Sequence, residues 1–568
     1  MHHMKLLLFL IALLLARPAA AISDPLSVPN NRFGIHIADL NDIPDVAPLV
    51  NSSGGDWGYV TLVAPQTDQN TQSWQKLFDQ MRRLHLIPIV RLATRLEGAS
   101  WAKPKKEEIR DWVAFLTSLN WPVENRYIIL FNEPNHANEW GNTIDPEGYA
   151  DILVAFAKVL KETNEDFFIL PAGLDASAAS DGRSLDAAEF LRRMVATYPE
   201  VLDIIDGWTS HSYPNPGFSG SPYAWGRGTL RTFSWELDYL KQLGLKRELP
   251  VFITETGWVH AEGKFWQPRL LTPGAVGVNL RVASQTVWTD PGIVAVTPFV
   301  FNYQDYPFDH FSFKKLGSPE FYDHYFAYQS IPKRTGRPRQ HESFSISHPL
   351  LPDKLIASSR YTFTAELSNA GQSILDPANG YQLTIDAKDF SVSDVTIPYL
   401  EPGQKGTLTF SLGTPRTAGT IPVALRIAHG DTVIPLEART ITVAPPPSVT
   451  IRAQLGWRKT SAAEGVKVLV YQGNRLIHEF PRQSLVGGAV TVSGVTDIIP
   501  GQPYRVVLVV PSYLPRQKIL PLSEGITLAS LPRLLPLDTD EDGALTTNDI
   551  LLLLKLPPAV VMNRFFGP

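Results

Sequence analysis

Two glutamates stand where short apolar runs end. Glu133 follows the run 127–131, and Glu255 follows the run 250–254. If both runs are strands of one parallel sheet, their carboxyl ends meet at the same edge, and the two side chains share a site. A pair of carboxyl groups can cleave a glycosidic bond, because one protonates the leaving oxygen while the other stabilises or attacks the oxocarbenium-like centre. Different surroundings must then keep one group protonated and the other ionised.

The elements that would position these glutamates repeat along the chain. Short apolar runs alternate with amphipathic segments, at 33–37, 59–64, 86–92, 127–131, 167–172, 204–210, 250–254 and 294–301. Continuous apolar runs indicate strands buried on both faces and wrapped by helices. Eight such units predict a (β/α)₈ TIM barrel over residues 22–332. A doubly wound open sheet is the alternative, but it would need a glycine-rich phosphate loop after the first strand, and residues 38–42 contain no glycine.

The glutamates also carry a family resemblance. The triplet Asn132-Glu133-Pro134 resembles the strand-four signature of the clan A glycoside hydrolases, and Glu255 in the run 253–258 is similar to their strand-seven nucleophile. This resemblance, over roughly residues 30 to 320, implies that Glu133 is the general acid/base, Glu255 is the nucleophile and Asn132 binds the sugar 2-hydroxyl. It implies retention of configuration, which requires carboxyl groups about 5–5.5 Å apart, whereas inversion requires about 6.5–9.5 Å. The alternative is that both glutamates serve in structural ion pairs.

Two further strand ends fit the same resemblance, and the end of the first strand is expected to lie beside them. His211 and Tyr213 form an His-x-Tyr motif similar to the clan's pair, in which the tyrosine hydroxyl holds the nucleophile carboxylate. Arg91 ends the run 86–92 and is similar to the clan arginine near the nucleophile. His36 ends the first run and is expected to line the same mouth. The alternatives are packing at the barrel rim for the histidines and the tyrosine, and an outer salt bridge for the arginine.

Aromatic side chains suit sugars because the C–H faces of a pyranose pack against aromatic rings. Trp140 and Trp258 follow the fourth and seventh strands, and Tyr303 follows the eighth. Many clan A families have a tryptophan at the end of strand eight, but the run 299–303 has none, so Trp258 is hypothesised to take that place. Packing in the protein core is the alternative interpretation for each of these rings.

An acidic segment near the C-terminus has the spacing of a calcium loop. Ca²⁺ takes six to eight oxygen ligands, which loop positions 1, 3, 5, 7, 9 and 12 supply. These positions hold Asp538, Asp540, Asp542, the Ala544 carbonyl, Thr546 and Asp549. An aspartate at position 12 resembles a dockerin repeat, and only one such repeat is found. A local calcium staple is therefore favoured over a cohesin-like partner, and a solvated acidic turn is the alternative. No cofactor is expected for catalysis.

The rest of the chain predicts accessory modules. Alternating apolar and polar residues, broken by turn signals, indicate an immunoglobulin-like β-sandwich and then a second β-rich module. The expected boundaries are a solvated linker at 333–341, the immunoglobulin-like β-sandwich at 342–444, a proline spacer at 445–447, the second β-rich module at 448–530 and the dockerin-like segment at 531–568. The modules contain few tryptophans, which gives little support for carbohydrate binding through them.

Composition excludes several classes of protein. The chain has 568 residues, of which 44% are hydrophobic and 19% charged, so it is not mainly disordered. It has no cysteine, which rules out disulfides, thiol nucleophiles and cysteine-bound metals. A net charge of −5 gives no broad basic field for nucleic acid.

The first 21 residues read as a signal peptide. Lys5 is followed by the apolar run 6–16 and by small residues at 19–21. The apolar run is too short for a transmembrane helix, which needs about 20 residues, and no second span is found. Export to the cell surface or the medium is therefore predicted, and an uncleaved membrane anchor is the alternative.

These observations predict an exported retaining glycosidase, hydrolysing O-glycosyl bonds of a polysaccharide or oligosaccharide. A transglycosidase, or a hydrolase that trims the producer's own exopolysaccharide, would use the same two glutamates. A surface adhesion protein that binds glycan without turnover is the alternative from another class. Intact Glu133 and Glu255 argue against it.

Overall fold

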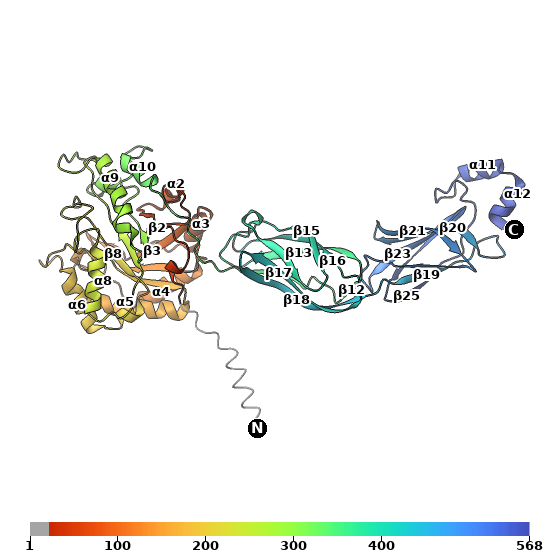
Figure 1. Ribbon diagram of the computed structural model, residues 1–568, viewed down its shortest axis with the longest axis horizontal. Helices are drawn as coiled ribbons and strands as arrows, with labels where there is room; N and C mark the ends of the chain where they lie inside the picture. The colour runs from red at the N-terminus through yellow and green to blue at the C-terminus, as the bar shows by residue number, and fades with distance from the viewer. Residues whose placement is uncertain (1–21, 567–568) are drawn as a thin grey trace, which may run out of the picture. The chain divides into compact units, whose positions relative to one another are not determined.

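The computed structural model describes residues 22–566, so the predicted signal peptide lies outside the described residues. The chain divides into two compact units, with the boundary between His341 and Glu342 (Figure 1). Each unit has its own hydrophobic cores.

Parallel strands form the centre of the first unit, in two sheets. The larger sheet has the order β1-β2-β3-β6-β7, and the smaller has the order β10-β9-β8. Their bounds are β1 Gly34–His36, β2 Gly58–Pro65, β3 Leu86–Ala93, β6 Arg126–Leu130, β7 Phe167–Pro171, β8 Trp208–His211, β9 Val251–Glu255 and β10 Ile293–Val296. All pairings within the two sheets are parallel.

Backbone bridges join the two sheets in two places, beside β1 and β10 at one edge and beside β7 and β8 at the other. Phe33, just before β1, forms a parallel bridge with Val296 of β10. At the other edge, Asp175 after β7 bridges in parallel to His211 of β8. The carboxyl ends of all eight strands consequently face one region.

Helices cover the outside of the strands, as the amphipathic segments predict (Figure 1). Trp74, Trp112 and Tyr149 are each 1% exposed and lie on the apolar faces of α3, α4 and α5. The main helices of this unit are α2 Ile43–Val50, α3 Thr71–Arg83, α4 Ile109–Ser118, α5 Pro146–Thr163, α6 Ala187–Thr197, α7 Val201–Ile204, α8 Thr232–Gln242, α9 Pro273–Gln285 and α10 Asp323–Gln329. A second cluster, which includes Tyr127, Phe168 and Phe252, fills the space enclosed by the strands.

Two strands differ from their predicted bounds. The run 204–210 contains the end of α7, so β8 begins only at Trp208. The run 294–301 leaves the strand conformation after Val296, because Thr297 turns its hydroxyl to the Thr254 carbonyl at 2.8 Å and to Thr61 at 2.9 Å. The residues after Val296 can therefore bend across the carboxyl ends of the strands.

The segment 333–341 is not a solvated linker, contrary to the sequence prediction. The Gly336 N–H donates to the Asp56 carbonyl at 2.9 Å, and the Arg337 N–H donates to the Pro29 carbonyl at 2.7 Å. His341 pairs with Asp166 at 3.0 Å. The segment therefore belongs to the first unit. Lys333 is buried in that unit, whereas Arg334, Arg337 and Arg339 are exposed.

Lys333 anchors this segment. Its side chain is buried, and its ammonium group donates to the Ser52 hydroxyl at 3.0 Å. The same group donates to three backbone carbonyls, at 3.0–3.1 Å, from Tyr328, Gln329 and Ile331. Burial lowers the pKa of Lys333 to about 8.

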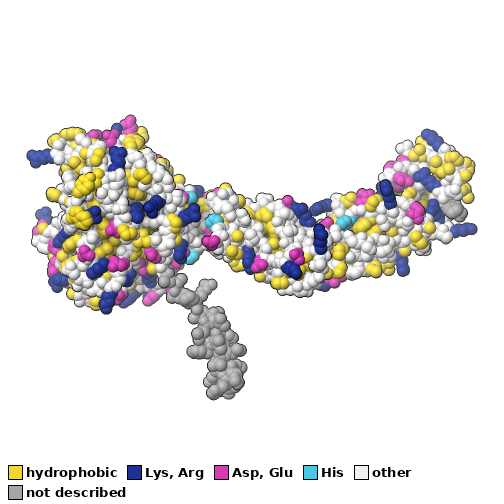
Figure 2. Space-filling view, in the orientation of Figure 1, with side chains coloured by type: hydrophobic (Ala, Val, Ile, Leu, Met, Phe, Trp, Pro, Cys, Tyr) yellow, Lys and Arg dark blue, Asp and Glu magenta, His cyan; other side chains and the backbone are white. Residues whose placement is uncertain are grey.

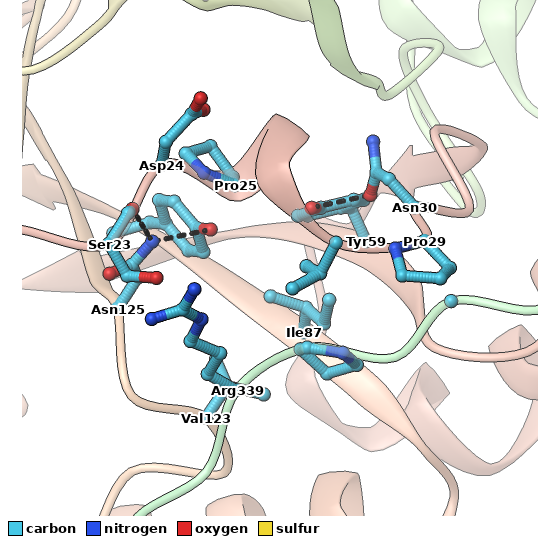
Figure 3. A pocket seen from close by; sticks show the side chains of 14 residues that line it. Ser23, Asp24, Pro25, Pro29, Asn30, Tyr59, Ile87, Val123, Asn125 and Arg339 are labelled. Atoms are coloured by element: carbon cyan, nitrogen blue, oxygen red, sulfur yellow. Dashed lines mark hydrogen bonds between the residues drawn. The ribbon is translucent and has the colours of Figure 1, made fainter.

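A small cavity lies beneath the larger sheet, beside the start of the unit and the segment 333–341 (Figure 3). The Asn125 amide bonds the Ser23 carbonyl at 2.8 Å and the Tyr127 hydroxyl at 3.2 Å, and the Tyr59 hydroxyl bonds Asn30 at 2.8 Å. The cavity volume of about 20 Å³ has room for about one water molecule. It is part of the packing and not a ligand site.

The second unit consists of mainly antiparallel sheets, in which the pairs β12–β18 and β19–β25 are parallel, followed by short helices. Two four-stranded sheets, β11-β13-β16-β15 and β12-β18-β17-β14, enclose one core, and the sheets β22-β19-β25 and β21-β20-β23-β24 enclose another. The strand bounds are β11 Phe344–Ile346, β12 Lys354–Ile356, β13 Arg360–Asn369, β14 Gln382–Asp386, β15 Ser391–Thr396, β16 Lys405–Gly413, β17 Gly419–His429, β18 Thr432–Ala444, β19 Ser448–Arg452, β20 Ala463–Gln472, β21 Arg475–Leu485, β22 Ala489–Ser493, β23 Pro503–Val510, β24 Tyr513–Pro521 and β25 Ile526–Ser530. The chain ends in α11 Thr547–Lys555, α12 Pro558–Val561 and η8 Met562–Phe566.

The surface carries both signs of charge. Figure 2 shows basic and acidic side chains interspersed on the visible face of the first unit. Within residues 22–566, no helix combines the length and the apolar character needed to cross a membrane.

Replacement of Lys333 by methionine is expected to destabilise the first unit by about 2–3 kcal/mol, because four buried acceptors lose their charged donor. Urea unfolding followed by tryptophan fluorescence measures this directly, since all 13 tryptophans except Trp457 lie in the first unit. Lys315→Met is the control, because its ion pair with Glu320 is exposed and contributes less than about 1 kcal/mol. Equal midpoints for the two variants would contradict the anchoring role.

Candidate active site

A cavity of about 460 Å³ lies at the carboxyl ends of the strands. Seven of the residues singled out by the sequence line it: His36, Arg91, Asn132, Glu133, Tyr213, Glu255 and Tyr303. His211 is 4% exposed and bonds directly to one of them. Residues that lie far apart in the sequence thus come together from β1, β3, β8 and β9 and from the loops that follow β6, β8 and β10.

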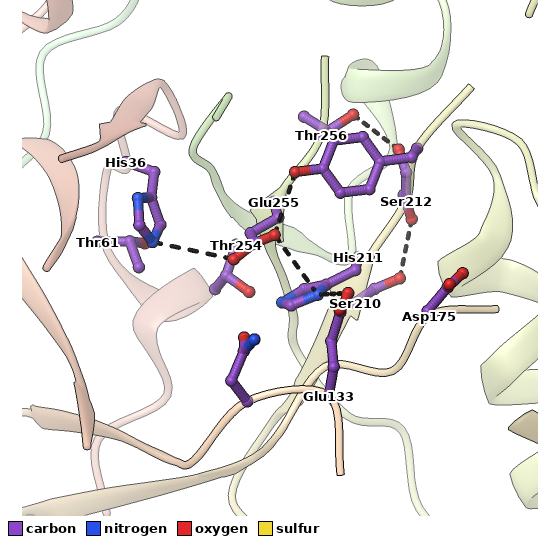
Figure 4. A network of polar contacts seen from close by, with 12 residues as sticks. His36, Thr61, Glu133, Asp175, Ser210, His211, Ser212, Thr254, Glu255 and Thr256 are labelled. Atoms are coloured by element: carbon purple, nitrogen blue, oxygen red, sulfur yellow. Dashed lines mark hydrogen bonds and ion pairs between the residues drawn. The ribbon is translucent and has the colours of Figure 1, made fainter. Parts of the chain in front are cut away.

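The two glutamates meet at one histidine (Figure 4). The Nδ1 atom of His211 lies 2.7 Å from Oε1 of Glu133 and 3.7 Å from Oε2 of Glu255. One carboxylate oxygen of each glutamate and one ring nitrogen of His211 all lie within 4.8 Å of one another. The two carboxyl groups therefore face each other across one small space.

Glu133 is held by an unusual stretch of backbone. Phe131 has φ +74° and Glu133 has φ +29°, both in the left-handed region that residues other than glycine rarely adopt. The Glu133 N–H donates to the Gly173 carbonyl at 3.1 Å, and the Glu133 carbonyl accepts from the His136 N–H at 2.8 Å. Strain of this kind costs about 1–3 kcal/mol per residue and is concentrated at functional sites.

Glu255 lies among groups that favour its ionised form. The Tyr213 hydroxyl donates to its carboxylate at 3.1 Å, and the Arg91 guanidinium donates at 3.2 Å. Burial by itself raises the pKa of Glu255, but the charges of His211 and Arg91 and the Tyr213 hydrogen bond outweigh it and lower this pKa. The carboxylate of Glu255 is thus ionised although it is buried.

The two histidines of the site carry different charges. Burial would lower the pKa of His211, but the carboxylates of Glu255 and Glu133 oppose this and raise the pKa to about 8. Burial lowers the pKa of His36 to about 3, although the Glu255 carboxylate, 4.0 Å from its Nε2 atom, partly opposes the shift. Near neutral pH, His211 is therefore a cation and His36 is neutral.

Gly173 allows His211 to take its place. A Cβ atom on Gly173 would lie 2.3 Å from Cδ2 and 2.5 Å from Nε2 of the His211 ring. Both distances are shorter than non-bonded atoms tolerate, so any side chain here would displace the imidazole from the carboxylates.

Glu139 is a third carboxyl group in the cavity, and the sequence analysis missed it. The Asn132 amide donates to Glu139 at 3.3 Å, while its carbonyl oxygen accepts from Arg91. Burial raises the pKa of Glu139 to about 7, although Arg91 partly opposes the shift. Its place in the loop after β6, six residues beyond Glu133, is the only signal that could have indicated it.

The predicted aromatic residues divide into two groups. Tyr303 lines the cavity, together with Trp101, Phe299 and Phe308, of which Trp101 was not singled out from the sequence. Trp258 is 2% exposed and donates to the Gly220 carbonyl at 2.8 Å, and it is not part of the cavity lining.

Trp140 is likewise outside the lining. It is fully buried against Phe131 and Tyr149. The hypotheses that place Trp258 at the catalytic sugar and Trp140 against substrate are therefore wrong, and both rings belong to the protein core.

The acidic loop near the C-terminus brings three of its predicted ligands together. Carboxylate oxygens of Asp538, Asp540 and Asp549 lie within 4.8 Å of one another. Asp549 also accepts the Thr539 and Thr546 N–H groups at 2.7 Å each, and the Thr546 bond is the main reason that its pKa falls to about 2.

Asp542 and Gly543 contribute to the conformation of the loop itself. The Asp542 carboxylate is outside the cluster and accepts the Ala544 N–H at 2.8 Å. Gly543 makes the turn with φ +85°, a conformation that favours glycine. The donor set consists of hard oxygen atoms, which fits Ca²⁺.

The chain matches no protein-family model and no curated protein. Several solved structures with partial similarity are glycoside hydrolases. A family 39 glycoside hydrolase from Bacteroides cellulosilyticus is 14% identical, with 69% of this chain and 82% of that chain covered and a TM-score of 0.36. The family 51 α-L-arabinofuranosidase AbfB from Bifidobacterium longum is 9% identical, with coverages of 71% and 97% and a TM-score of 0.37.

An FMN-binding β-glucuronidase from Faecalibacterium prausnitzii is 10% identical, covers 73% of this chain and has a TM-score of 0.35. This chain spans 56% of the length of that glucuronidase. At TM-scores below 0.5, these likenesses carry no argument about the fold or the activity of this chain.

The raised pKa of His211 should make stability depend on pH. The native protein holds this proton up to about pH 8, whereas an unfolded histidine releases it near pH 6.5. The resulting stabilisation, about 2 kcal/mol, is fully present below pH 6.5 and is lost as the pH rises through 8. Urea unfolding of the wild type and of His211→Gln at pH 6 and pH 9 measures it as the difference between the two proteins. A pH dependence shared by both proteins would contradict this prediction.

Proposed function

We propose that this protein is a glycoside hydrolase that cleaves O-glycosidic bonds with retention of configuration. The observation that carries the proposal is the approach of Glu133 and Glu255 oxygens to within 4.8 Å in one cavity. This spacing agrees better with the roughly 5–5.5 Å of retaining enzymes than with the roughly 6.5–9.5 Å of inverting ones. The different partners of the two carboxyl groups support different roles for them.

In the first step, the ionised Glu255 attacks the anomeric carbon and forms a glycosyl ester. Tyr213 and Arg91 hold the carboxylate for this attack. Glu133 delivers a proton to the leaving oxygen as the glycosidic bond breaks. His211 bonds Glu133 at 2.7 Å, and this hydrogen bond stabilises the Glu133 carboxylate that is left after the proton is delivered.

In the second step, water attacks the anomeric carbon of the ester. Glu133 accepts the water proton, and Glu255 leaves as a carboxylate, which restores the site. Asn132, held by Arg91 on one side and by Glu139 on the other, has one amide hydrogen left to bond the sugar 2-hydroxyl. This arrangement makes Glu139 a positioning residue for Asn132.

The same proposal includes a fold for each unit and a location for the protein. The two parallel sheets, joined at both pairs of edges, support a closed (β/α)₈ barrel of the clan A type for the first unit. The paired four-stranded sheets around one core support an immunoglobulin-like sandwich at the start of the second unit. The signal-peptide pattern of residues 1–21 supports export, with action outside the cell or at its surface.

The loop 538–549 is proposed to bind one Ca²⁺ ion. Asp538, Asp540 and Asp549 would hold the ion, whose charge would offset the repulsion between their carboxylates. A single loop supports a local calcium staple at the start of α11 and gives no support for a cohesin-like partner.

Substitution of the two glutamates tests the proposed function. Glu255→Ala should abolish turnover of every substrate in a panel of aryl β-glycosides, because no ester can form. Glu133→Ala should lower kcat by about 10²–10⁴-fold for glycosides with poor leaving groups and much less for dinitrophenyl glycosides, which need no acid. Glu320→Ala, at an exposed surface pair, is the control. If wild type and both active-site variants share one rate, the assignment is wrong.

Calcium should stabilise the second unit. Ca²⁺ at 100 times its Kd is expected to add about 2.7 kcal/mol to the free energy of unfolding, because the ion binds only the folded loop. Calorimetric scans of the full chain with calcium and with chelator measure the shift, with Asp538→Asn/Asp540→Asn as the variant and Asp394→Asn, at an exposed ion pair, as the control. An unchanged transition in the wild type would refute the calcium site.

A further inference from the structure

Three exposed aromatic side chains lie in the loops that follow β9 and β10, and the loop after β10 lines the catalytic cavity. Phe265 and Trp266 lie between β9 and α9 and are 55% and 62% exposed, and Tyr306 lies after β10 and is 51% exposed. We call these three residues the aromatic rim. Single exposed apolar side chains are common on protein surfaces, but a cluster of them indicates a binding site.

The rim is held in a fixed arrangement. The rings of Phe265 and Tyr306 meet edge to face, with centroids 5.6 Å apart. The Lys264 ammonium pairs with Asp305 at 2.7 Å, and the Lys264 N–H donates to the buried Asp309 carboxylate at 2.6 Å. The two loops that carry the rim are therefore joined to each other, so the rings of Phe265 and Tyr306 present a preformed surface.

The rim is continuous with the cavity. Phe308, two residues beyond Tyr306, lines the cavity and is 43% exposed. Its ring contacts Phe299 at 5.6 Å and Tyr303 at 5.4 Å, and both of these residues also line the cavity. The aromatic lining of the cavity and Tyr306 of the rim are thus carried by the same loop after β10.

A groove that carries several polar side chains leaves the cavity elsewhere. Ala38 and Val63 line both the cavity and a groove of about 870 Å³ between the loops that follow β1 and β2. Carboxylate, amide and ammonium side chains line much of this groove: Asp39, Asn41, Asp68, Lys76 and Gln80. These groups can exchange hydrogen bonds with hydroxyl groups of a ligand.

We propose that the rim and the groove bind sugar units of one polysaccharide chain that passes through the catalytic cavity, so that cleavage falls within the chain. Pyranose C–H faces pack against rings, and sugar hydroxyls pair with the polar side chains of the groove. The continuity of both surfaces with the cavity favours a long glycan over a protein partner. The inference rests on the proposed glycosidase function, and it adds a polymeric substrate and an endo mode of action.

The test compares one variant on short and long substrates. The variant is Phe265→Ala/Trp266→Ala/Tyr306→Ala, and the control is Trp457→Ala, an exposed tryptophan of the second unit. The substrates are nitrophenyl β-glycosides and four soluble polysaccharides: mixed-linkage β-glucan, laminarin, xylan and galactomannan. The measured quantity is kcat/KM for the polysaccharide that the wild type cleaves, divided by kcat/KM for the aryl glycoside. This ratio should fall about tenfold or more in the variant, and the control should keep the wild-type ratio.

Binding without turnover provides an independent measurement. In the Glu255→Ala background, electrophoresis through gels that contain each polysaccharide should retard the protein, and the rim substitutions should remove the retardation. The inference is overturned if the ratio is the same in the variant and the wild type. It is also overturned if the wild type cleaves aryl glycosides but cleaves none of the polysaccharides and is retarded by none of them. Failure of the proposed function would look different: wild type inactive on every substrate, with rim-dependent retardation still present.

Discussion

The position of one imidazole between two carboxyl groups determines the geometry of the site. His211 lies 2.7 Å from Glu133 and 3.7 Å from Glu255, and its positive charge compensates part of the repulsion between them. This charge is the largest of the causes that lower the pKa of the buried Glu255 carboxylate. The surrounding backbone serves this contact, since Gly173 leaves room for the ring and the left-handed backbone at Glu133 brings in one carboxyl group.

Around this contact, the partners of the two glutamates differ. Glu255 receives hydrogen bonds from Tyr213 and Arg91, which stabilise a charge. Glu133 has His211 as its close polar partner, which can exchange a proton with it. This asymmetry is what a double-displacement mechanism requires, because the nucleophile must stay ionised while the acid/base changes its protonation state twice.

The shape of the first unit around the site indicates the size of its substrate. A cavity of about 460 Å³ holds the carboxyl groups, but aromatic and polar surfaces continue from it toward solvent. At the amino ends of the strands, the segment 333–341 packs against the unit through Lys333 and leaves space there for about one water molecule. The two carboxyl groups and the aromatic side chains around them lie at the carboxyl ends of the strands.

The alternation of strands and helices, the two glutamates at strand ends and the division into modules could be predicted from the order of the residues. Those features depend on local periodicity and on residue type, which are readable in order along the chain. Which side chains meet became clear from the folded structure: Glu139 and Trp101 line the cavity, Trp140 and Trp258 lie in the core, and the segment 333–341 is bound to the first unit. Contacts of this kind depend on how loops fold over strand ends, and loop conformation is set by packing between distant residues rather than by local pattern.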